Sequence, residues 1–178
     1  SCLCRAPDVR RTLMKRIAIL GATGSIGTTC LNAIRSGKLD AEPVFLLSST
    51  SDIAHLGAEF HATALRSSHS SRNEILDKLQ SSSPDIVLNA VSGTAGLSYT
   101  MEAIDLGYDI ALANKESLVL GGRLVMESAA ERGVSIIPVD SEHSAIYSLL
   151  RGRRARKLII TASGGPFFGK SRQELSAV

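Results

Sequence analysis

The chain has 178 residues, of which 44% are hydrophobic and 21% are charged, and its formal net charge is +3. This composition excludes a disordered or collagen-like chain, and no apolar run approaches the roughly 18 residues that a membrane-spanning helix requires. The three cysteines, Cys2, Cys4 and Cys30, give neither a disulfide framework nor the paired spacing of a zinc site. We therefore expect a globular protein of a reducing, cytoplasmic compartment with no membrane partner.

Residues 1–13 precede Met14, which stands like a natural start just before the first predicted strand. This segment lacks the apolar core of an export signal. A transit-peptide remnant would place the protein in a plastid, whereas upstream translation or an expression remnant would leave it cytoplasmic. We expect residues 1–13 to lie outside the fold.

From Arg16 onward, short apolar runs alternate with helical periodicity, which predicts βα units and a parallel sheet. Strands are predicted, in chain order, at residues 16–20, 44–47, 85–90, 109–113, 135–139 and 157–162. Helices are predicted at residues 26–34, 52–60, 97–104, 123–131, 143–150 and 172–175. The stretch 67–72 is predicted to be a loop. The expected fold class is α/β, a Rossmann-like doubly wound and mostly parallel sheet.

A glycine-rich turn, Gly21-Ala-Thr-Gly24-Ser-Ile-Gly27, lies between the first predicted strand and the first predicted helix. Glycines there permit a tight turn and let a pyrophosphate approach the N-terminus of the helix. The spacing is G-x-x-G-x-x-G rather than G-x-G-x-x-G. Because it forms the first βα turn, it favours a dinucleotide site over a turn that is merely tight.

The end of the second predicted strand reads Ser48-Ser49-Thr50-Ser51, where an acceptor for the adenine ribose is expected. A carboxylate there would bind a free 2′-hydroxyl group and repel a phosphate. Four hydroxyl groups in its place favour NADP over NAD. Asp52, one residue further on, keeps NAD open as an alternative.

Two polar segments follow later strands, at the sheet edge where ligands bind an open α/β sheet. Asn114-Lys-Glu-Ser117 is compatible with a ligand site or with a helix N-cap. Asp140-Ser-Glu-His143 carries two carboxylates that suit a hard cation such as Mg²⁺ or Mn²⁺, and it also fits a helix cap with an exposed histidine.

Two more segments have alternative interpretations. The stretch from Thr161 to Pro166 places hydroxyl groups and backbone amides at a strand end, which suits an anion cradle or a Gly-Pro turn. A basic cluster contains Arg151, Arg153, Arg154, Arg156 and Lys157. Because no aromatic residue stands beside it for base stacking, we interpret the cluster as a solvated loop and expect no nucleic-acid partner.

Four blocks occur in one order: Gly21-Ala-Thr-Gly-Ser-Ile-Gly27, Leu112-Ala-Asn-Lys-Glu-Ser-Leu-Val119, Pro138-Val-Asp-Ser-Glu-His143 and Thr161-Ala-Ser-Gly-Gly-Pro-Phe167. Together they resemble the 1-deoxy-D-xylulose 5-phosphate reductoisomerases, enzymes of the non-mevalonate isoprenoid pathway. The likeness runs from Met14 to about Leu175. It implies an NADPH-binding domain at 14–139, the truncated start of an α+β catalytic domain at 140–178, and a homodimer when the protein is intact.

The resemblance also implies an activity and a set of site residues. The activity is the NADPH- and divalent-metal-dependent conversion of 1-deoxy-D-xylulose 5-phosphate, a phosphorylated sugar, to 2-C-methyl-D-erythritol 4-phosphate. Implied cofactor-binding residues are Gly21, Thr23, Gly24, Ser25, Ile26, Gly27, Ser49, Thr50, Ser51, Asn114 and Glu116. Implied ligands of Mg²⁺ or Mn²⁺ are Asp140 and Glu142, which together with Lys115 form the implied catalytic set. Implied substrate-binding residues are Lys115, Ser141, Glu142 and Ser163.

The chain departs from the family pattern in two places. Family members usually carry Gly-Lys-Asn near the end of the second strand, and the matching Ser49-Thr50-Ser51 has no lysine. The stretch 61–84 is short, so we expect one strand of the family to be missing there. The family's third acidic metal ligand and its flexible lid are expected to lie beyond Val178.

Two other functions remain open on the sequence: a non-catalytic NADP-binding module, and a related NADP oxidoreductase that acts on another substrate. Asp140 and Glu142, followed by the glycine-rich turn after Thr161, argue against the first. A module that only binds a dinucleotide needs neither metal carboxylates nor a second anion cradle.

Overall fold

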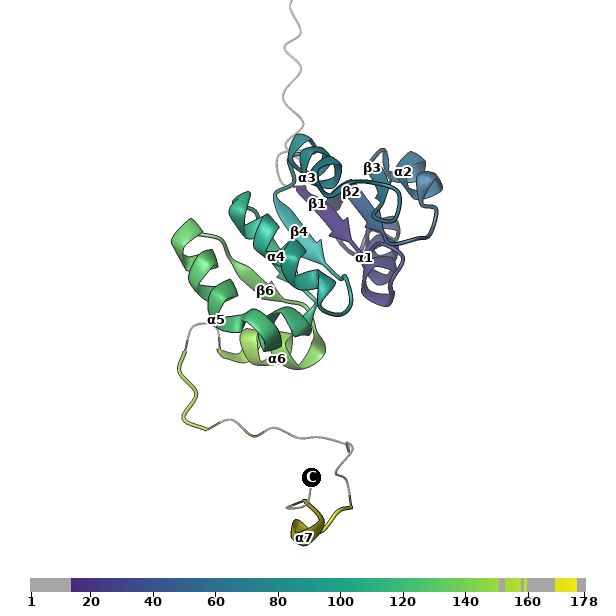
Figure 1. The fold of residues 1–178 in the computed structure, drawn as a ribbon. Coiled ribbons are helices and arrows are strands. Elements are labelled where there is room, and N and C mark those ends of the chain that lie inside the picture. The colour runs from purple at the N-terminus through teal and green to yellow at the C-terminus, as the bar shows by residue number, and fades with distance from the viewer. Residues whose placement is uncertain (1–13, 151–152, 158, 160–168, 176–178) are drawn as a thin grey trace, which may run out of the picture.

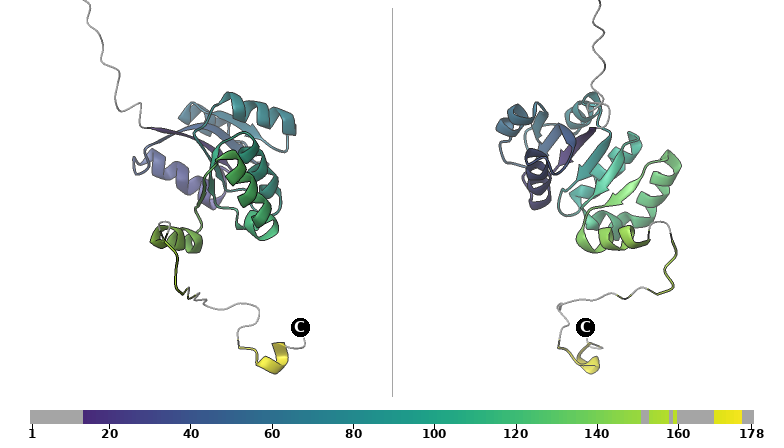
Figure 2. Two further views of the ribbon diagram at one scale, coloured as in Figure 1. Left: turned by 90° about the vertical axis from the view of Figure 1, so that its left-hand side faces the viewer. Right: turned by 180° about the vertical axis from the view of Figure 1, so that it is seen from behind.

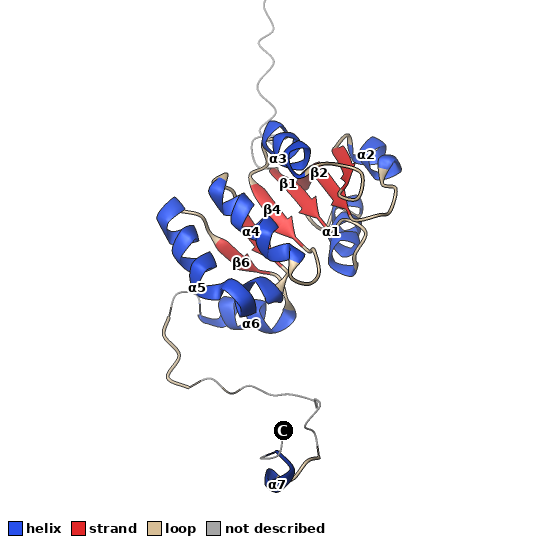
Figure 3. Ribbon diagram, in the orientation of Figure 1, coloured by secondary structure: helices blue, strands red, loops and turns tan. Residues whose placement is uncertain are grey.

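The computed structural model describes residues 14–150, 153–157, 159 and 169–175. Its centre is a six-stranded parallel sheet with the order β3-β2-β1-β4-β5-β6 (Figures 1 and 3). The strands are β1 (Lys15–Leu20), β2 (Ala41–Ser48), β3 (Thr63–Arg66), β4 (Ile86–Asn89), β5 (Asp109–Leu112) and β6 (Ile136–Pro138). This is the strand order of a dinucleotide-binding Rossmann fold, in which the chain reverses direction across the sheet between β1 and β4.

Helices cover both faces of the sheet. The described helices are α1 (Ser25–Arg35), α2 (Ala54–Phe60), α3 (Arg72–Ser81), α4 (Ala95–Asp105), α5 (Lys115–Arg132), α6 (Ser141–Leu150) and α7 (Arg172–Leu175), of which α6 and α7 bury no residue. Viewed along the sheet, α1 lies on one face and α3, α4 and α5 lie on the other (Figure 2, left). None of the described helices combines the length and apolar character needed to cross a bilayer.

The alternation of side chains along the strands builds two cores. In β1, Ala18 and Leu20 pack on the face of α3, α4 and α5, whereas Ile17 and Ile19 pack on the face of α1 and α2. Successive strand residues point to opposite faces, so a strand that is covered on both sides is apolar at nearly every position. The short apolar runs in the sequence are a consequence of this burial.

The structure confirms five of the predicted strands, with shifts of a few residues at their ends. The stretch 61–84 contains β3 and α3, and the expectation that one strand of the family is missing there stays a prediction. The structure also extends one of the predicted helices. The helix predicted at 123–131 is the second part of α5, which begins at Lys115. The backbone of Gly121 is non-helical (φ −126°, ψ 19°) and separates the two parts. The interruption hides the helical periodicity of the first part in the sequence. Most of the strand predicted at 157–162 lies outside the described residues.

The start of α3 depends on a local hydrogen bond. Ser71 is the N-cap, and its side chain accepts a hydrogen bond from the Glu74 amide at 3.2 Å. Ile75 and Leu79, four residues apart, then bury one face of an otherwise polar helix. The cap therefore fixes where α3 begins, and it places the next residue, Arg72, beside the carboxyl edge of the sheet.

Candidate dinucleotide and metal site

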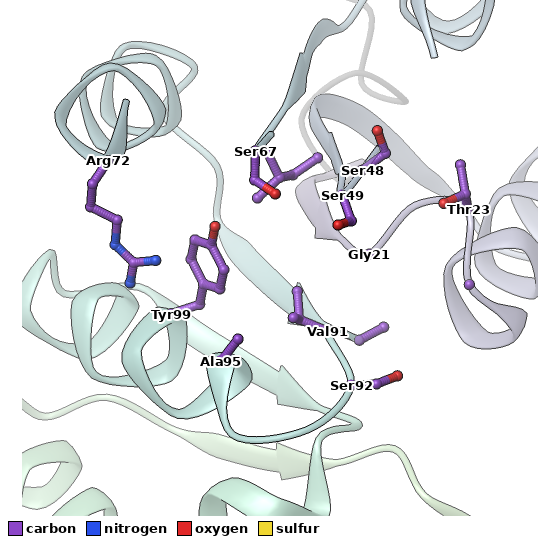
Figure 4. Close-up of a pocket in the computed structure, with 13 residues that line it drawn as sticks. Gly21, Thr23, Ser48, Ser49, Ser67, Arg72, Val91, Ser92, Ala95 and Tyr99 are labelled. Carbon is purple, nitrogen blue, oxygen red and sulfur yellow. The ribbon is translucent and has the colours of Figure 1, made fainter. Parts of the chain in front are cut away.

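A pocket of about 450 Å³ opens at the carboxyl ends of β1, β2 and β4, where the strand order reverses (Figure 4). Ligands of open α/β sheets bind at this point. Polar residues on its wall include Thr23, Ser48, Ser49, Ser67 and Ser92. None of the described residues that line the pocket is acidic, and Arg72 is the charged residue among them. The pocket therefore suits an anionic ligand.

The glycine turn forms one side of this pocket. The backbone of Gly21 has φ +85°, and a Cβ atom there would lie 2.6 Å from the Ala90 carbonyl oxygen. The amides of Gly21 and Ala22 both donate to the Leu47 carbonyl oxygen, at 2.8 and 2.9 Å. The turn is therefore hydrogen-bonded to β2 and packed closely on the residue that follows β4. Only glycine fits at position 21.

Helix α1 begins at the pocket without a side-chain cap. Its N-cap is Gly24, no acidic residue stands in its first turn, and Thr23 and Ser25 are exposed. The first amides of a helix have no partner within the helix, and the helix dipole makes this end positive. The predicted phosphate-binding turn, including Ile26 and Gly27, therefore presents uncapped amides at the pocket.

The predicted ribose-binding segment follows β2. Ser48 is buried and donates to the Ser51 carbonyl oxygen at 2.5 Å, while Ser49, Thr50 and Ser51 are exposed. The nearby Asp52 carboxylate instead accepts a hydrogen bond from the Ala54 amide at 3.0 Å, which lowers the pKa of Asp52. Asp52 thus turns toward the start of α2, and serine hydroxyl groups are left at the pocket.

Arg72 and Tyr99 form the far wall of the pocket (Figure 4). The Arg72 guanidinium group lies 4.0 Å from the centroid of the Tyr99 ring, and its Nε atom is 2.5 Å from Glu102 Oε1. Our sequence reasoning did not identify either residue. The pattern Ser71-x-x-Glu74, a capping box, is the feature that could have placed Arg72 at the start of a helix.

The structure places Asn114 at the N-cap of α5. Asn114 is 2% exposed, and its Oδ1 atom accepts a hydrogen bond from the Ser117 amide at 2.8 Å. Lys115 is exposed and Glu116 is half-buried. The cap interpretation is therefore confirmed, and the implied cofactor contacts of Asn114 and Glu116 stay predictions.

The predicted metal ligands lie at the start of α6. Asp140 Oδ1 accepts a hydrogen bond from the His143 amide at 3.2 Å and is 2.7 Å from His143 Nδ1. Glu142 accepts a hydrogen bond from the Ser141 hydroxyl group, which is the main cause of its lowered pKa, and the positive charge of Lys115 contributes to the same shift. Asp140 and Glu142 thus lie together at the start of α6, and the role of Lys115 beside them stays a prediction.

The carboxylates of Asp140 and Glu142 are donors of the kind that hard divalent cations prefer. In the part of the chain that the structure describes, no group of three or more His, Cys, Asp or Glu side chains is placed to hold a metal ion. The two carboxylates therefore fit a metal whose remaining coordination positions are filled by other oxygen ligands. Ser163 lies outside the described residues.

Comparison with known proteins gives one consistent result. The family model described as 1-deoxy-D-xylulose 5-phosphate reductoisomerase matches residues 43–122, and the model of the C-terminal domain of that reductoisomerase matches residues 136–178. A protein of this name from Listeria monocytogenes is 41% identical in an alignment that is 190 residues long with its gaps. The alignment covers 93% of this chain and 49% of that relative. The chain thus spans about half the length of the curated relatives it matches.

Solved structures agree with the sequence comparison. The reductoisomerase of Zymomonas mobilis in complex with NADPH gives a TM-score of 0.74 at 34% identity, over 93% of this chain and 50% of that one. A complex of DOX-P reductoisomerase with NADPH, fosmidomycin and magnesium gives a TM-score of 0.65 at 31% identity, over 93% and 49%. On these matches, the chain belongs to the 1-deoxy-D-xylulose 5-phosphate reductoisomerase family.

Proposed function

We propose that this chain carries the NADPH-binding part and the beginning of the catalytic part of a reductoisomerase. The reaction is the isomerisation and reduction of 1-deoxy-D-xylulose 5-phosphate to 2-C-methyl-D-erythritol 4-phosphate, with oxidation of NADPH to NADP⁺ and uptake of one proton. The observation that carries the proposal is the uncapped start of α1, which faces a pocket with no acidic lining among the described residues. Relatives solved with NADPH and with magnesium support it.

The cofactor is assigned to the glycine turn and to the ends of the neighbouring strands. Amides of the turn from Gly21 to Gly27, with the hydroxyl groups of Thr23 and Ser25, would hold the pyrophosphate. Ser49, Thr50 and Ser51 would hold the phosphorylated adenosine ribose. Asn114 and Glu116, at the start of α5, would lie along the nicotinamide ribose.

The metal and the substrate are assigned to residues at the starts of α5 and α6 and to Ser163. Asp140 and Glu142 would hold Mg²⁺ or Mn²⁺, which when bound supplies Lewis-acid polarisation of the substrate oxygens. Lys115, whose charge already acts on Glu142, would place a positive charge where oxyanion character develops on the substrate. Ser141 and Ser163 would contact the substrate, Ser163 through its phosphate.

We further propose a domain boundary between residues 139 and 140, a homodimeric intact protein and a cytoplasmic location. The boundary is supported by the end of β6 at Pro138, which completes the parallel sheet, and by the start of the C-terminal family model at residue 136. The location is supported by bacterial relatives.

The cofactor assignment predicts that the chain binds NADPH at least about tenfold more tightly than NADH, a difference of ~1.4 kcal/mol. The reason is that hydroxyl groups and Arg72, with no carboxylate among the described lining residues, line the pocket to which we assign the 2′-phosphate group. Isothermal titration with each cofactor measures the ratio. Equal affinities, or tighter binding of NADH, would contradict the assignment.

A matched pair of variants sharpens this test. Ser49→Asp places a carboxylate at the end of β2, so it should weaken NADPH binding by about tenfold or more and leave NADH binding equal or tighter. Ser81→Asp adds the same charge at an exposed position at the end of α3 and should leave both affinities unchanged. If both variants weakened NADPH binding equally, the loss of affinity would come from the change in net charge, and the assignment of Ser49 to the ribose site would be contradicted.

A further inference from the structure

Four buried polar side chains join the two loops that flank the proposed site. Asn89, Thr100 and Ser117 are fully buried, and Asn114 is 2% exposed. They come from the end of β4, the middle of α4 and the start of α5. Buried polar groups are costly unless they are hydrogen-bonded, so their contacts show what holds them there.

Asn89 organises the loop between β4 and α4 from the inside. Its Nδ2 atom donates to the Gly96 carbonyl oxygen and to Thr100 Oγ1, both at 2.8 Å. Its Oδ1 atom accepts a hydrogen bond from the Val91 amide at 3.2 Å. One side chain therefore fixes both ends of this loop, whose residues Val91 and Ser92 line the cofactor pocket.

Asn114 binds the same loop from the other side. Its Nδ2 atom donates to the carbonyl oxygens of Val91 and Gly93, at 2.7 and 2.9 Å. Its Oδ1 atom accepts hydrogen bonds from the amide and the hydroxyl group of Ser117. The Asn114 amide packs so closely on Gly96 that a Cβ atom there would lie 2.5 Å from Asn114 Cγ.

Thr100 connects the two asparagines. Its Oγ1 atom accepts the hydrogen bond from Asn89 and lies 3.2 Å from Ser117 Oγ, which in turn contacts Asn114. The wall of the cofactor pocket and the first turn of α5, which carries Lys115 and Glu116, are thereby parts of one hydrogen-bonded unit. A fully satisfied buried network of this kind is rigid.

We infer that Asn89 and Thr100 are positioning residues. They hold the loop after β4 against the start of α5, and so fix the cofactor pocket relative to Lys115 and Glu116. Neither residue is assigned to bind cofactor, metal or substrate. The inference about cofactor geometry rests on the proposed function of the pocket, whereas the inference about the loop itself does not.

The test uses two substitutions at Thr100 with opposite chemistry. Thr100→Val keeps the shape of the side chain and removes the oxygen, so we expect NADPH affinity to fall by about tenfold. Thr100→Ser removes a methyl group and keeps the oxygen, so we expect affinity within about twofold of the original chain. Asn89→Ala should behave like Thr100→Val. Ile104→Val, a fully buried change one turn further along α4, is the control for lost packing and should not alter affinity.

Amide hydrogen exchange gives a second measurement that needs no cofactor. The Val91 and Ser117 amides, which the network holds, should exchange at least about tenfold faster in Thr100→Val and Asn89→Ala than in Thr100→Ser or Ile104→Val. Unchanged exchange and affinity in Thr100→Val, or equal changes in Thr100→Val and Ile104→Val, would overturn the inference. If the original chain bound no NADPH, the proposed function would fail, and the exchange rates alone would decide whether the network positions the loop.

Discussion

Replacing Gly21 by alanine should lower NADPH affinity by at least about a hundredfold and reduce the free energy of unfolding by about 2–5 kcal/mol. Two causes add. The backbone at φ +85° disfavours any side chain, and the new Cβ atom would lie 2.6 Å from the Ala90 carbonyl oxygen, which belongs to a backbone that cannot rotate away. Relief of that contact must displace the turn that presents the α1 amides to the cofactor. Titration with NADPH and urea unfolding measure the two effects.

Gly37→Ala is the matched control for this change. Gly37 also has a positive φ, +68°, but a Cβ atom there meets nothing within 4 Å, and the residue follows the far end of α1. Only the conformational penalty remains, about 1–2 kcal/mol, and NADPH affinity should be unchanged. Equal NADPH affinity in both variants would show that the turn at Gly21 does not bind the cofactor.

Ser25→Asp separates cofactor binding from folding. An acidic residue in the first turn of α1 favours the helix dipole, so stability should stay equal or rise by about 0.3–1 kcal/mol. The same charge would repel the pyrophosphate and should weaken NADPH binding by about tenfold or more. Tighter or unchanged binding would place the phosphates elsewhere.

Much of the fold could be predicted because both faces of the sheet are covered. Burial on two sides makes strands such as β1 apolar without interruption from Ile17 to Leu20, and the glycine turn after β1 marks the first βα unit. Helix α3 was missed because only Ile75 and Leu79 are buried in it, so its apolar periodicity is weak. Strand β3 was missed because its residues, at the sheet edge, are all only partly buried and give no apolar run.

The site was predictable where it depends on local sequence and not where it depends on pairing between distant segments. The uncapped start of α1 and the hydroxyl groups after β2 follow from residues that are close in the chain. Arg72 and Tyr99 meet at the pocket only because β3 pairs with β2, and β4 with β1, in the observed register. The buried contact between Asn89 and Thr100 also depends on how α4 packs, which periodicity alone does not give.

Substitution of the carboxylates at the start of α6 should cause a large loss of metal affinity. Asp140→Asn and Glu142→Gln should each weaken Mn²⁺ binding to the chain by at least about tenfold, because each removes one of two charged oxygen ligands. In a protein that also contains the second half found in the relatives, each change should abolish turnover. Affinity for NADPH should stay within about twofold, since neither carboxylate belongs to the dinucleotide pocket. Electron paramagnetic resonance of free Mn²⁺ measures the metal affinity directly.

The local contacts of the two residues predict how these variants should differ. Asp140 caps α6 through the His143 amide, and asparagine preserves that cap, so Asp140→Asn should lose metal affinity without unfolding the helix. Glu142 carries no cap, and its charge acts on Lys115. Glu127→Gln, an exposed carboxylate in α5, removes the same charge without touching the site and should leave Mn²⁺ binding unchanged. If Asp140→Asn and Glu142→Gln bound Mn²⁺ as tightly as Glu127→Gln does, Asp140 would be a helix cap only, and the metal would have to be held by other residues.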